Sequence, residues 1–245
     1  GRVQNWLVKG TGAANLGGGV VCGGGTVCNS RVEDNWAMYG GGLACTQTGL
    51  LRNSEFVGNR ASYGGGGVCI LSHSQAVVEN CTIAGNYSEE GYGGLQCMST
   101  GSVFVNSIIY GNLAKFSSNL TAGGQSFLYC CSAPADPGEG NLTNNPVFLS
   151  LDMLDCRLAT NSPCINTGTN LPWMTNAVDV RNGARILGGR TDIGANEAGP
   201  FGCAFSADRR GGVVSVPVWF LSRVTGTHVA NPYYRWDYDN NGTPD

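Results

Sequence analysis

The sequence contains few charges and almost no histidine. Charged residues make up 13% of the 245 positions, the formal net charge is −3, and two histidines are present. A chain without a basic excess has no attractive field for nucleic acid or anionic lipid, so we expect neither as a partner. No run of eighteen apolar residues occurs, which predicts that no segment spans a membrane.

Apolar residues at helical spacing are also missing. Short β-branched and aromatic runs alternate instead with glycine and asparagine, and glycine alone fills 39 positions. This pattern predicts short strands joined by tight bends. The expected fold class is therefore all-β.

Asparagine, in contrast, recurs at regular intervals. One set is spaced by steps of 24, 27 and 26 residues, and each member is followed six residues later by a second asparagine. The first set is Asn29, Asn53, Asn80 and Asn106, and the second set is Asn35, Asn59, Asn86 and Asn112. A period of about 25 residues indicates a solenoid, here a parallel β-helix with one repeat per coil.

The contents of each repeat predict how the coils stack. Asparagine tolerates the left-handed backbone conformation at a bend, and stacked side-chain amides hydrogen-bond along the axis, so two asparagine ladders are expected. Apolar residues two before and three after the first asparagine should form a continuous core at the ~4.8 Å spacing of paired strands. These core positions are Val3, Val27, Leu51, Val78 and Phe104, and Val32, Phe56, Ile83 and Ile109.

Eleven cysteines suggest an oxidising, extracellular setting. Four of them close a glycine run, namely Cys22, Cys45, Cys69 and Cys97. We interpret these four as a file of buried small hydrophobic side chains, because side chains stacked in parallel point the same way and are poorly placed to bridge. The alternative is a file of metal-binding thiolates.

The glycine and asparagine motifs together resemble the polymorphic outer-membrane-protein repeats of bacterial surface proteins. Gly41-Gly42-Leu43 and Gly93-Gly94-Leu95 match the Gly-Gly-aliphatic signature, and Phe56-Val57-Gly58-Asn59 matches Phe-x-x-Asn. The resemblance covers roughly residues 1–130 and implies a right-handed parallel β-helix. It implies no particular activity, since unrelated functions share one scaffold.

Residues 146–198 resemble the end region of the choice-of-anchor Q family. The matching motifs include Asn145-Pro146-Val147-Phe148, Ser162-Pro163-Cys164-Ile165-Asn166 and Asp192-Ile193-Gly194-Ala195-Asn196-Glu197. The resemblance implies a cap that closes the β-helix and keeps its last coil from exposing open hydrogen-bonding edges. Cys156 and Cys164, separated by a turn with Pro163, are the disulfide candidate in this segment.

The same segment holds the densest set of opposite charges in the chain. These residues are Asp155, Arg157, Asp179, Arg181, Arg185, Asp192 and Glu197. They either tie the irregular cap together, which we favour, or contain a catalytic carboxylate pair. Because carboxylates in the coils fall in different registers and His73 and His228 have no recognisable catalytic partner, we predict a protein that is not an enzyme. The alternative is a lyase or hydrolase that degrades polysaccharide.

The last segment, residues 199–245, changes character. Tyr233-Tyr234-Arg235-Trp236-Asp237-Tyr238-Asp239 resembles the Trp-Asp-Phe core of polycystic-kidney-disease-type domains and implies part of an Ig-like sandwich. Asp237, Asp239, Asn241 and Asp245 also match the opening of a calcium loop, in which alternating oxygens surround the cation. The alternative is a simple turn between two strands. We expect no required cofactor, with Ca²⁺ as the one candidate.

These segments predict a secreted structural or adhesive protein of the bacterial cell surface. Its parts are coils over 1–145, a cap over 146–198 and a partial sandwich over 199–245. Coil ends and an incomplete sandwich favour self-association, head to tail or by strand addition, as in an extracellular fibre, or pairing with other surface proteins. The chain starts at Gly1 without an initiator methionine and already in register, which suggests a processed product or a segment of something longer.

Two features point to sugars. The aromatic residues near the glycine turns either stack on a glycan or fold back over the glycines, and these are Trp36, Tyr39, Tyr63, Tyr87 and Tyr92. Five Asn-x-Ser/Thr sequons also occur, a number that an asparagine-rich chain produces by chance. Asn119 and Asn141 lie outside the predicted ladders and are the candidates for glycosylation.

Overall fold

A computed structural model describes residues 2–115, 117, 119–121, 123–133 and 138–199, together with the backbone of 202–207 and 220–225. The chain divides into two compact units, Gly1–Ala198 and Gly199–Asp245, which are described separately. No helix in the described part of the chain is long and apolar enough to cross a membrane.

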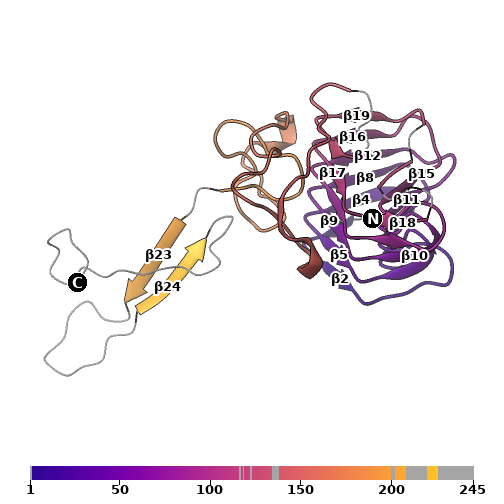
Figure 1. Ribbon diagram of the computed structural model, residues 1–245, viewed down its shortest axis with the longest axis horizontal. Coiled ribbons are helices and arrows are strands. Elements are labelled where there is room, and N and C mark those ends of the chain that lie inside the picture. The colour runs from indigo at the N-terminus through magenta and orange to yellow at the C-terminus, as the bar shows by residue number, and fades with distance from the viewer. Residues whose placement is uncertain are drawn as a thin grey trace, which may run out of the picture. The chain divides into compact units, whose positions relative to one another are not determined.

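The first unit is a solenoid of parallel strands, which confirms the predicted fold class (Figure 1). Each complete coil contributes one strand to each of four sheets, in the order A, B, C, D. Sheet A contains β1 (Arg2–Gln4), β4 (Gly25–Cys28), β8 (Gly49–Arg52), β12 (Ala76–Glu79), β16 (Val103–Val105) and β19 (Ser126–Leu128). Sheet B contains β2 (Leu7–Lys9), β5 (Arg31–Glu33), β9 (Glu55–Val57), β13 (Thr82–Ala84), β17 (Ile108–Tyr110) and β20 (Cys131–Ser132).

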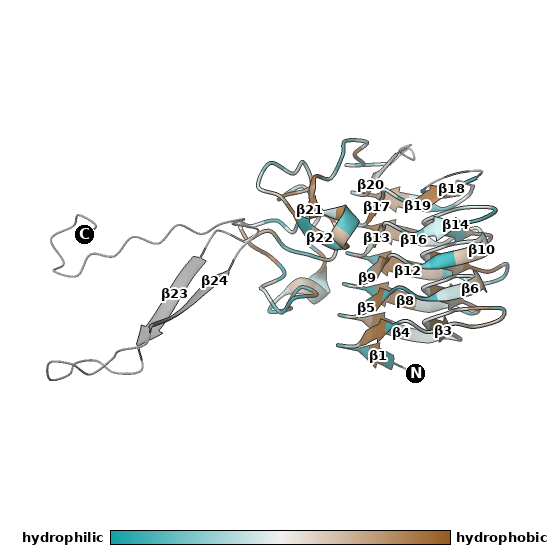
Figure 2. Ribbon diagram, turned by 60° about the horizontal axis from the view of Figure 1, so that its bottom comes forward, coloured by the Kyte–Doolittle hydropathy of each residue, from teal (hydrophilic) through white to brown (hydrophobic). Residues whose placement is uncertain are grey.

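The other two sheets are shorter. Sheet C contains β6 (Trp36–Tyr39), β10 (Arg60–Gly64), β14 (Tyr87–Ser88) and β18 (Leu113–Ala114). Sheet D contains β3 (Val20–Cys22), β7 (Leu43–Cys45), β11 (Val68–Ile70) and β15 (Leu95–Cys97). Figure 2 shows the coils stacked from β1 to β20.

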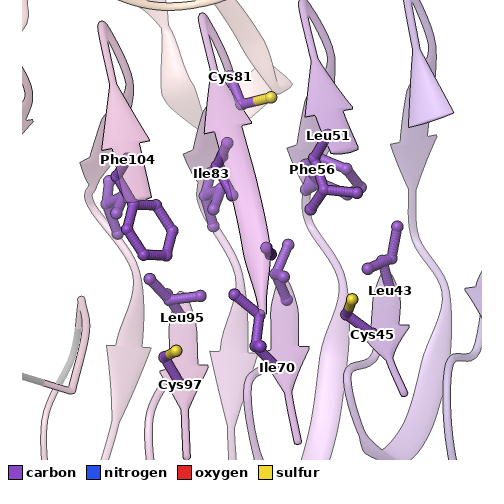
Figure 3. Packing of buried hydrophobic residues seen from close by; sticks show 14 of the residues in the cluster. Leu43, Cys45, Leu51, Phe56, Ile70, Cys81, Ile83, Leu95, Cys97 and Phe104 are labelled. Atoms are coloured by element: carbon purple, nitrogen blue, oxygen red, sulfur yellow. The ribbon is translucent and has the colours of Figure 1, made fainter. Parts of the chain in front are cut away.

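The predicted core columns are confirmed. Val27, Leu51, Val78 and Phe104 are paired in successive strands of sheet A, and Val32, Phe56, Ile83 and Ile109 are paired in the same way in sheet B. All eight are buried in one cluster, part of which Figure 3 shows. Full burial of one such side chain stabilises the fold by about 1.5–3 kcal/mol, so the stacked columns are the main source of stability.

The second set of asparagines forms the predicted ladder. Nδ2 of Asn35, Asn59 and Asn86 donates to Oδ1 of the next asparagine at 3.0, 3.0 and 2.9 Å. The same oxygens accept backbone N–H groups of the preceding coil, and the amides also donate to backbone carbonyls of that coil. Each buried amide is therefore satisfied on both sides, which fixes the register of adjacent coils.

The glycine turns make room for this ladder. A Cβ atom on Gly67 would lie 2.7 Å from Nδ2 of Asn86 and 2.9 Å from the carbonyl oxygen of Gly94. Only glycine allows so close an approach between one turn and the next coil. The glycine and asparagine motifs recur in phase because they pack against each other.

The first set of asparagines has the predicted left-handed backbone, with φ between 46° and 58° from Asn5 to Asn106. Its side-chain ladder is incomplete. Asn53 donates to Asn29 at 2.9 Å and Asn106 donates to Asn80 at 3.2 Å, whereas the described hydrogen bonds include none between Asn53 and Asn80. The amides of Asn53, Asn80 and Asn106 donate instead to residues 146–198.

The cysteine file differs from the prediction by one member. Cys22 is paired with Cys45, but the residue paired with both Cys45 and Cys97 is Ile70, while Cys69 is paired with Ala44 and Gln96. Figure 3 shows Ile70 at this inward position. The run Gly64–Gly67 is one glycine longer than Gly40–Gly42, and a slip of one residue places a side chain on the opposite face of the sheet.

Residues 146–198, which we call the cover, do not close the end of the last coil as predicted. They lie along the outer face of sheet B (Figures 1 and 2), with strands β21 (Phe148–Ser150) and β22 (Asp155–Leu158) and short 3₁₀ helices η1 (Leu151–Met153) and η2 (Pro172–Met174). Their hydrogen bonds reach from Arg31 in an early coil to Asn106 in a late one.

The last coil is covered by the residues that precede the cover. Leu142 donates its N–H to the carbonyl oxygen of Cys130 at 2.8 Å, and Ser132 donates to the carbonyl oxygen of Leu142 at 3.0 Å. Tyr129 donates to the carbonyl oxygen of Glu139 at 2.7 Å. This loop satisfies the edge that the cap was predicted to protect.

The second unit contains one antiparallel hairpin within its described residues, β23 (Gly202–Ala207) paired with β24 (Phe220–Thr225). The candidate calcium ligands Asp237, Asp239, Asn241 and Asp245 lie outside the described residues, as does the segment 233–239 that resembles a polycystic-kidney-disease-type core.

Candidate functional site

Sheet C presents a column of exposed side chains that runs along the axis of the solenoid. Trp36, Arg60, Tyr87 and Leu113 occupy paired positions in β6, β10, β14 and β18. Trp36, Tyr87 and Leu113 are 43%, 41% and 65% exposed. These large side chains are not part of the buried core of the coils. We call these four residues the sheet C column.

The spacing within the sheet C column follows from the coil. Successive strands lie ~4.8 Å apart, so Trp36 and Tyr87, two coils apart, are separated by about 10 Å along the axis. Arg60 lies between them, with its guanidinium carbon 5.1 Å from the centre of the Tyr87 ring. It also forms a 2.7 Å ion pair with Glu89. Aromatic faces at this interval with a cation between them can stack on alternate rings of an extended sugar chain.

The sequence left two alternatives for the aromatics, stacking on a glycan or folding back over the glycines, and the remaining tyrosines of this set do not all fit the same one. Tyr39 and Tyr63 stack on each other with ring centroids 5.7 Å apart, beside the glycine turns. Tyr63 is nevertheless 50% exposed, whereas Tyr39 and Tyr92 are less exposed than Tyr63. Trp36 and Tyr87 are thus the exposed aromatics of sheet C that, among the described residues, do not stack on another aromatic ring.

The charged residues of the cover form the predicted ties. Arg185 is fully buried and donates to Glu197 at 2.7 Å, to Asn53 at 2.9 Å and to the carbonyl oxygen of Ala195 at 3.0 Å. Burial raises the pKa of Glu197 to about 7, although the positive charge of Arg185 lowers it. Arg185 and Glu197 are buried, and their hydrogen bonds go to the cover and to the coils. They therefore hold the cover in place.

Two carboxylates near this tie also bind backbone. Asp179 accepts N–H groups from Gly183 at 2.7 Å and Glu197 at 2.9 Å. Asp192 accepts from Asn166 at 2.7 Å and Ala198 at 2.6 Å, and burial raises its pKa. Their hydrogen bonds are used to shape the irregular loops of the cover.

Both glycosylation candidates have their amides occupied. Asn119 is buried at 7% exposure and extends the second ladder, where its Oδ1 accepts from Asn112 and its Nδ2 donates to Ala133 at 2.7 Å. Asn141 donates to the carbonyl oxygen of Phe127 at 2.9 Å and accepts from the N–H of Cys130 at 2.8 Å. The prediction that both lie outside the ladders is wrong for Asn119, and neither amide is free for sugar in this fold.

The Cys156–Cys164 disulfide is not formed. Both are free thiols, and they are buried in separate clusters, Cys156 with Val57 and Ala84 and Cys164 with Ile108 and Ile193. The two cysteines face different parts of sheet B because the chain turns away between them. Within the described residues, no group of three or more His, Cys, Asp or Glu side chains is placed to hold a metal ion.

Comparisons with known proteins agree with the architecture. Neither the curated proteins nor the solved structures gave a match to this chain. The profile of the family described as "Right handed beta helix region" matches residues 5–150, which is more than half of the chain. The chain therefore belongs to the family of right-handed β-helix proteins.

Proposed function

We propose that this protein is an extracellular adhesive module of a bacterial surface that binds a glycan chain along the sheet C column. The observation that carries the proposal is the exposed alignment of Trp36, Arg60 and Tyr87 at intervals set by the coils. The ~10 Å between the strands that carry Trp36 and Tyr87 corresponds to about two rings of an extended sugar chain. The low content of charge and the resemblance to surface-protein repeats support an extracellular location.

Binding is better supported here than catalysis. The carboxylates beside the column are Glu89, bound to Arg60 at 2.7 Å, and Glu90, bound to Lys115 at 3.2 Å. Each is held in an exposed ion pair with a different partner. Glycoside hydrolysis needs two carboxylates on opposite sides of one bond, and this arrangement does not supply them.

The experiment compares glycan binding by wild type and by the variants Trp36→Ala and Tyr87→Ala, with Met153→Ala as control. Met153 is an apolar residue of the cover with 82% exposure, so its loss tests for general effects of removing surface apolar area. On an array of extended polysaccharides, each aromatic substitution should weaken binding about threefold to tenfold, the size of one stacking contact. The control should leave binding unchanged.

Urea unfolding of the same variants shows whether the coils remain intact. Absence of binding to any glycan, or binding that neither aromatic substitution changes, would contradict the proposal. Concentration-dependent filaments in that sample would favour the second hypothesis, a fibre subunit.

A further inference from the structure

Two adjoining hollows lie where the edge of the cover meets the corner between sheets A and B. The first has a volume of about 340 Å³ and is lined by Arg2, Asn29, Arg52 and Trp173 among others. The second, of about 310 Å³, is lined by Asn5, Trp6, Asn29 and Arg31 together with residues of the cover. They share Asn29, and we call them together the cover groove. It lies on a different face from the sheet C column.

The groove exists because the cover seals only part of the first asparagine column. Its hydrogen bonds reach Asn53, Asn80 and Asn106. Within the described residues it makes no hydrogen bond to Asn5 or Asn29, which continue the same column with the same left-handed backbone. These two amides line the groove instead.

The asparagines that the cover contacts show which groups the amides of this column bind. Asn53 donates to the carbonyl oxygen of Val178 at 2.8 Å and accepts from Arg185. Asn106 donates to the carbonyl oxygen of Thr169 and accepts from the N–H of the same residue, both at 2.8 Å. An amide that both donates and accepts is suited to the hydroxyl groups of a sugar.

The lining of the first hollow is positively charged. Arg2 and Arg52 both line it, and the lining residues include no carboxylate. Arg52 forms an ion pair through Nε with Glu79 at 2.7 Å, outside the lining. Arg2 has a 3.5 Å contact with Sγ of Cys28 and no carboxylate partner among the described residues. An anionic group between the two guanidinium groups would receive charge-assisted hydrogen bonds.

One tryptophan lines each hollow. The guanidinium carbon of Arg52 lies 4.6 Å from the centre of the Trp173 ring, and the buried indole N–H of Trp173 has no hydrogen-bond partner among the described residues. A buried donor without an acceptor is costly. Trp6 is 65% exposed at the second hollow.

We infer that the cover groove binds an anionic sugar, that is, a hydroxyl-bearing ring with a carboxylate or sulfate group. The anionic group lies between Arg2 and Arg52, the hydroxyls bind Asn29 and Asn176, and the ring packs against Trp173. This site is independent of the proposed function, because sheet C contributes no residue to it.

The test is a titration of the full chain with sodium glucuronate and with glucose 6-sulfate, followed by the NMR signal of the Trp173 indole N–H. Two matched controls are used. Glucose has the ring but no charge, and inorganic sulfate has the charge but no ring. We expect saturable binding of at least one anionic sugar and shifts of the Trp173 signal, with both controls at least tenfold weaker. Comparable binding of inorganic sulfate or of glucose would overturn the inference, as would no binding of either anionic sugar.

Two variants locate the site. Arg2→Met should weaken binding at least tenfold, and Arg2 lies outside the buried core, so folding is retained. Arg157→Met removes an arginine of the cover that pairs with Asp155 and serves as the control. Equal affinity of wild type and Arg2→Met, or equal losses in the two variants, would contradict the assignment.

Discussion

Arg185 and Asn53 lie 132 positions apart in the sequence and are joined by a hydrogen bond of 2.9 Å from Nη1 to Oδ1. This bond occupies an asparagine that would otherwise continue the ladder along the coils. The second partner of the guanidinium, Glu197, accepts at 2.7 Å and is itself buried. The cover is therefore attached to the solenoid through a buried charge that replaces a rung of the ladder.

Replacing Arg185 by methionine should strongly destabilise the protein. The substitution leaves the buried carboxylate of Glu197 without its cation, which costs about 3–5 kcal/mol when one partner of a buried pair is removed. Urea unfolding at pH 8 measures the loss. Arg157→Met, which breaks a partly exposed pair with Asp155, should cost less than about 1 kcal/mol. Equal losses in the two variants would show that the Arg185 tie does not stabilise the fold.

Asn86→Ala should break the second ladder. Oδ1 of Asn86 accepts the N–H of Asn59 at 2.8 Å, and its Nδ2 donates to the carbonyl oxygen of Phe56 at 2.8 Å, so the substitution leaves both buried backbone groups unpaired. At about 1–3 kcal/mol for each, the free energy of unfolding should fall by at least about 2 kcal/mol. The exposed Asn161→Ala is the control and should change stability by less than about 0.5 kcal/mol. A loss no larger than that of the control would mean that water replaces the rung.

Glu197 predicts a pH dependence of stability. Burial raises its pKa from 4.5 to about 7 in the folded protein. Between these values the folded state binds the proton more tightly than the unfolded state, so this group lowers the free energy of unfolding as the pH rises. The effect is at most about 3–4 kcal/mol, at 1.36 kcal/mol per pKa unit.

Glu197→Gln removes this titration. The free energy of unfolding of the variant should therefore decrease less steeply than that of wild type as the pH rises. Unfolding curves of both proteins from pH 4.5 to 8 test the point. Parallel pH profiles for wild type and variant would contradict it.

Cys22 should react faster than Cys69 and Cys81. A hydrogen bond from Cys45 lowers the pKa of Cys22 to about 7, whereas burial raises the pKa of Cys69 and of Cys81 to about 12. The thiolate is the reactive form, so iodoacetamide at pH 7.5 should modify Cys22 first. Peptide mapping by mass spectrometry at short times identifies the site, and Cys22→Ser should abolish the fast phase. Earlier modification of Cys69 or Cys81 would count against this environment.

The repeat made the coils predictable. Each strand contacts the strand one period away, so the spacing of asparagine and apolar residues was enough to place Val27 on Leu51 and Asn59 on Asn86. The aromatics of sheet C were named because they lie near the glycine turns. Their alignment, with Arg60 between Trp36 and Tyr87, required the register that the fold supplies.

Errors arose where a residue departs from the repeat. Cys69 fell outside the cysteine file because one extra glycine shifts it to the other face. Asn119 joined the second ladder only seven residues after Asn112, too early for the period to reveal it. Cys156 and Cys164 lie close in sequence but are separated by the surfaces on which they pack.

The sequence by itself determined the solenoid, its core columns and its asparagine corners, since these depend on contacts between neighbouring coils at a fixed period. The tertiary structure alone decided where the cover lies. Its position depends on pairs such as Arg185 with Asn53 and Asn196 with Glu55, which no period relates. The cover groove follows from that position, because docking along sheet B seals Asn53 and leaves Asn29 at the edge.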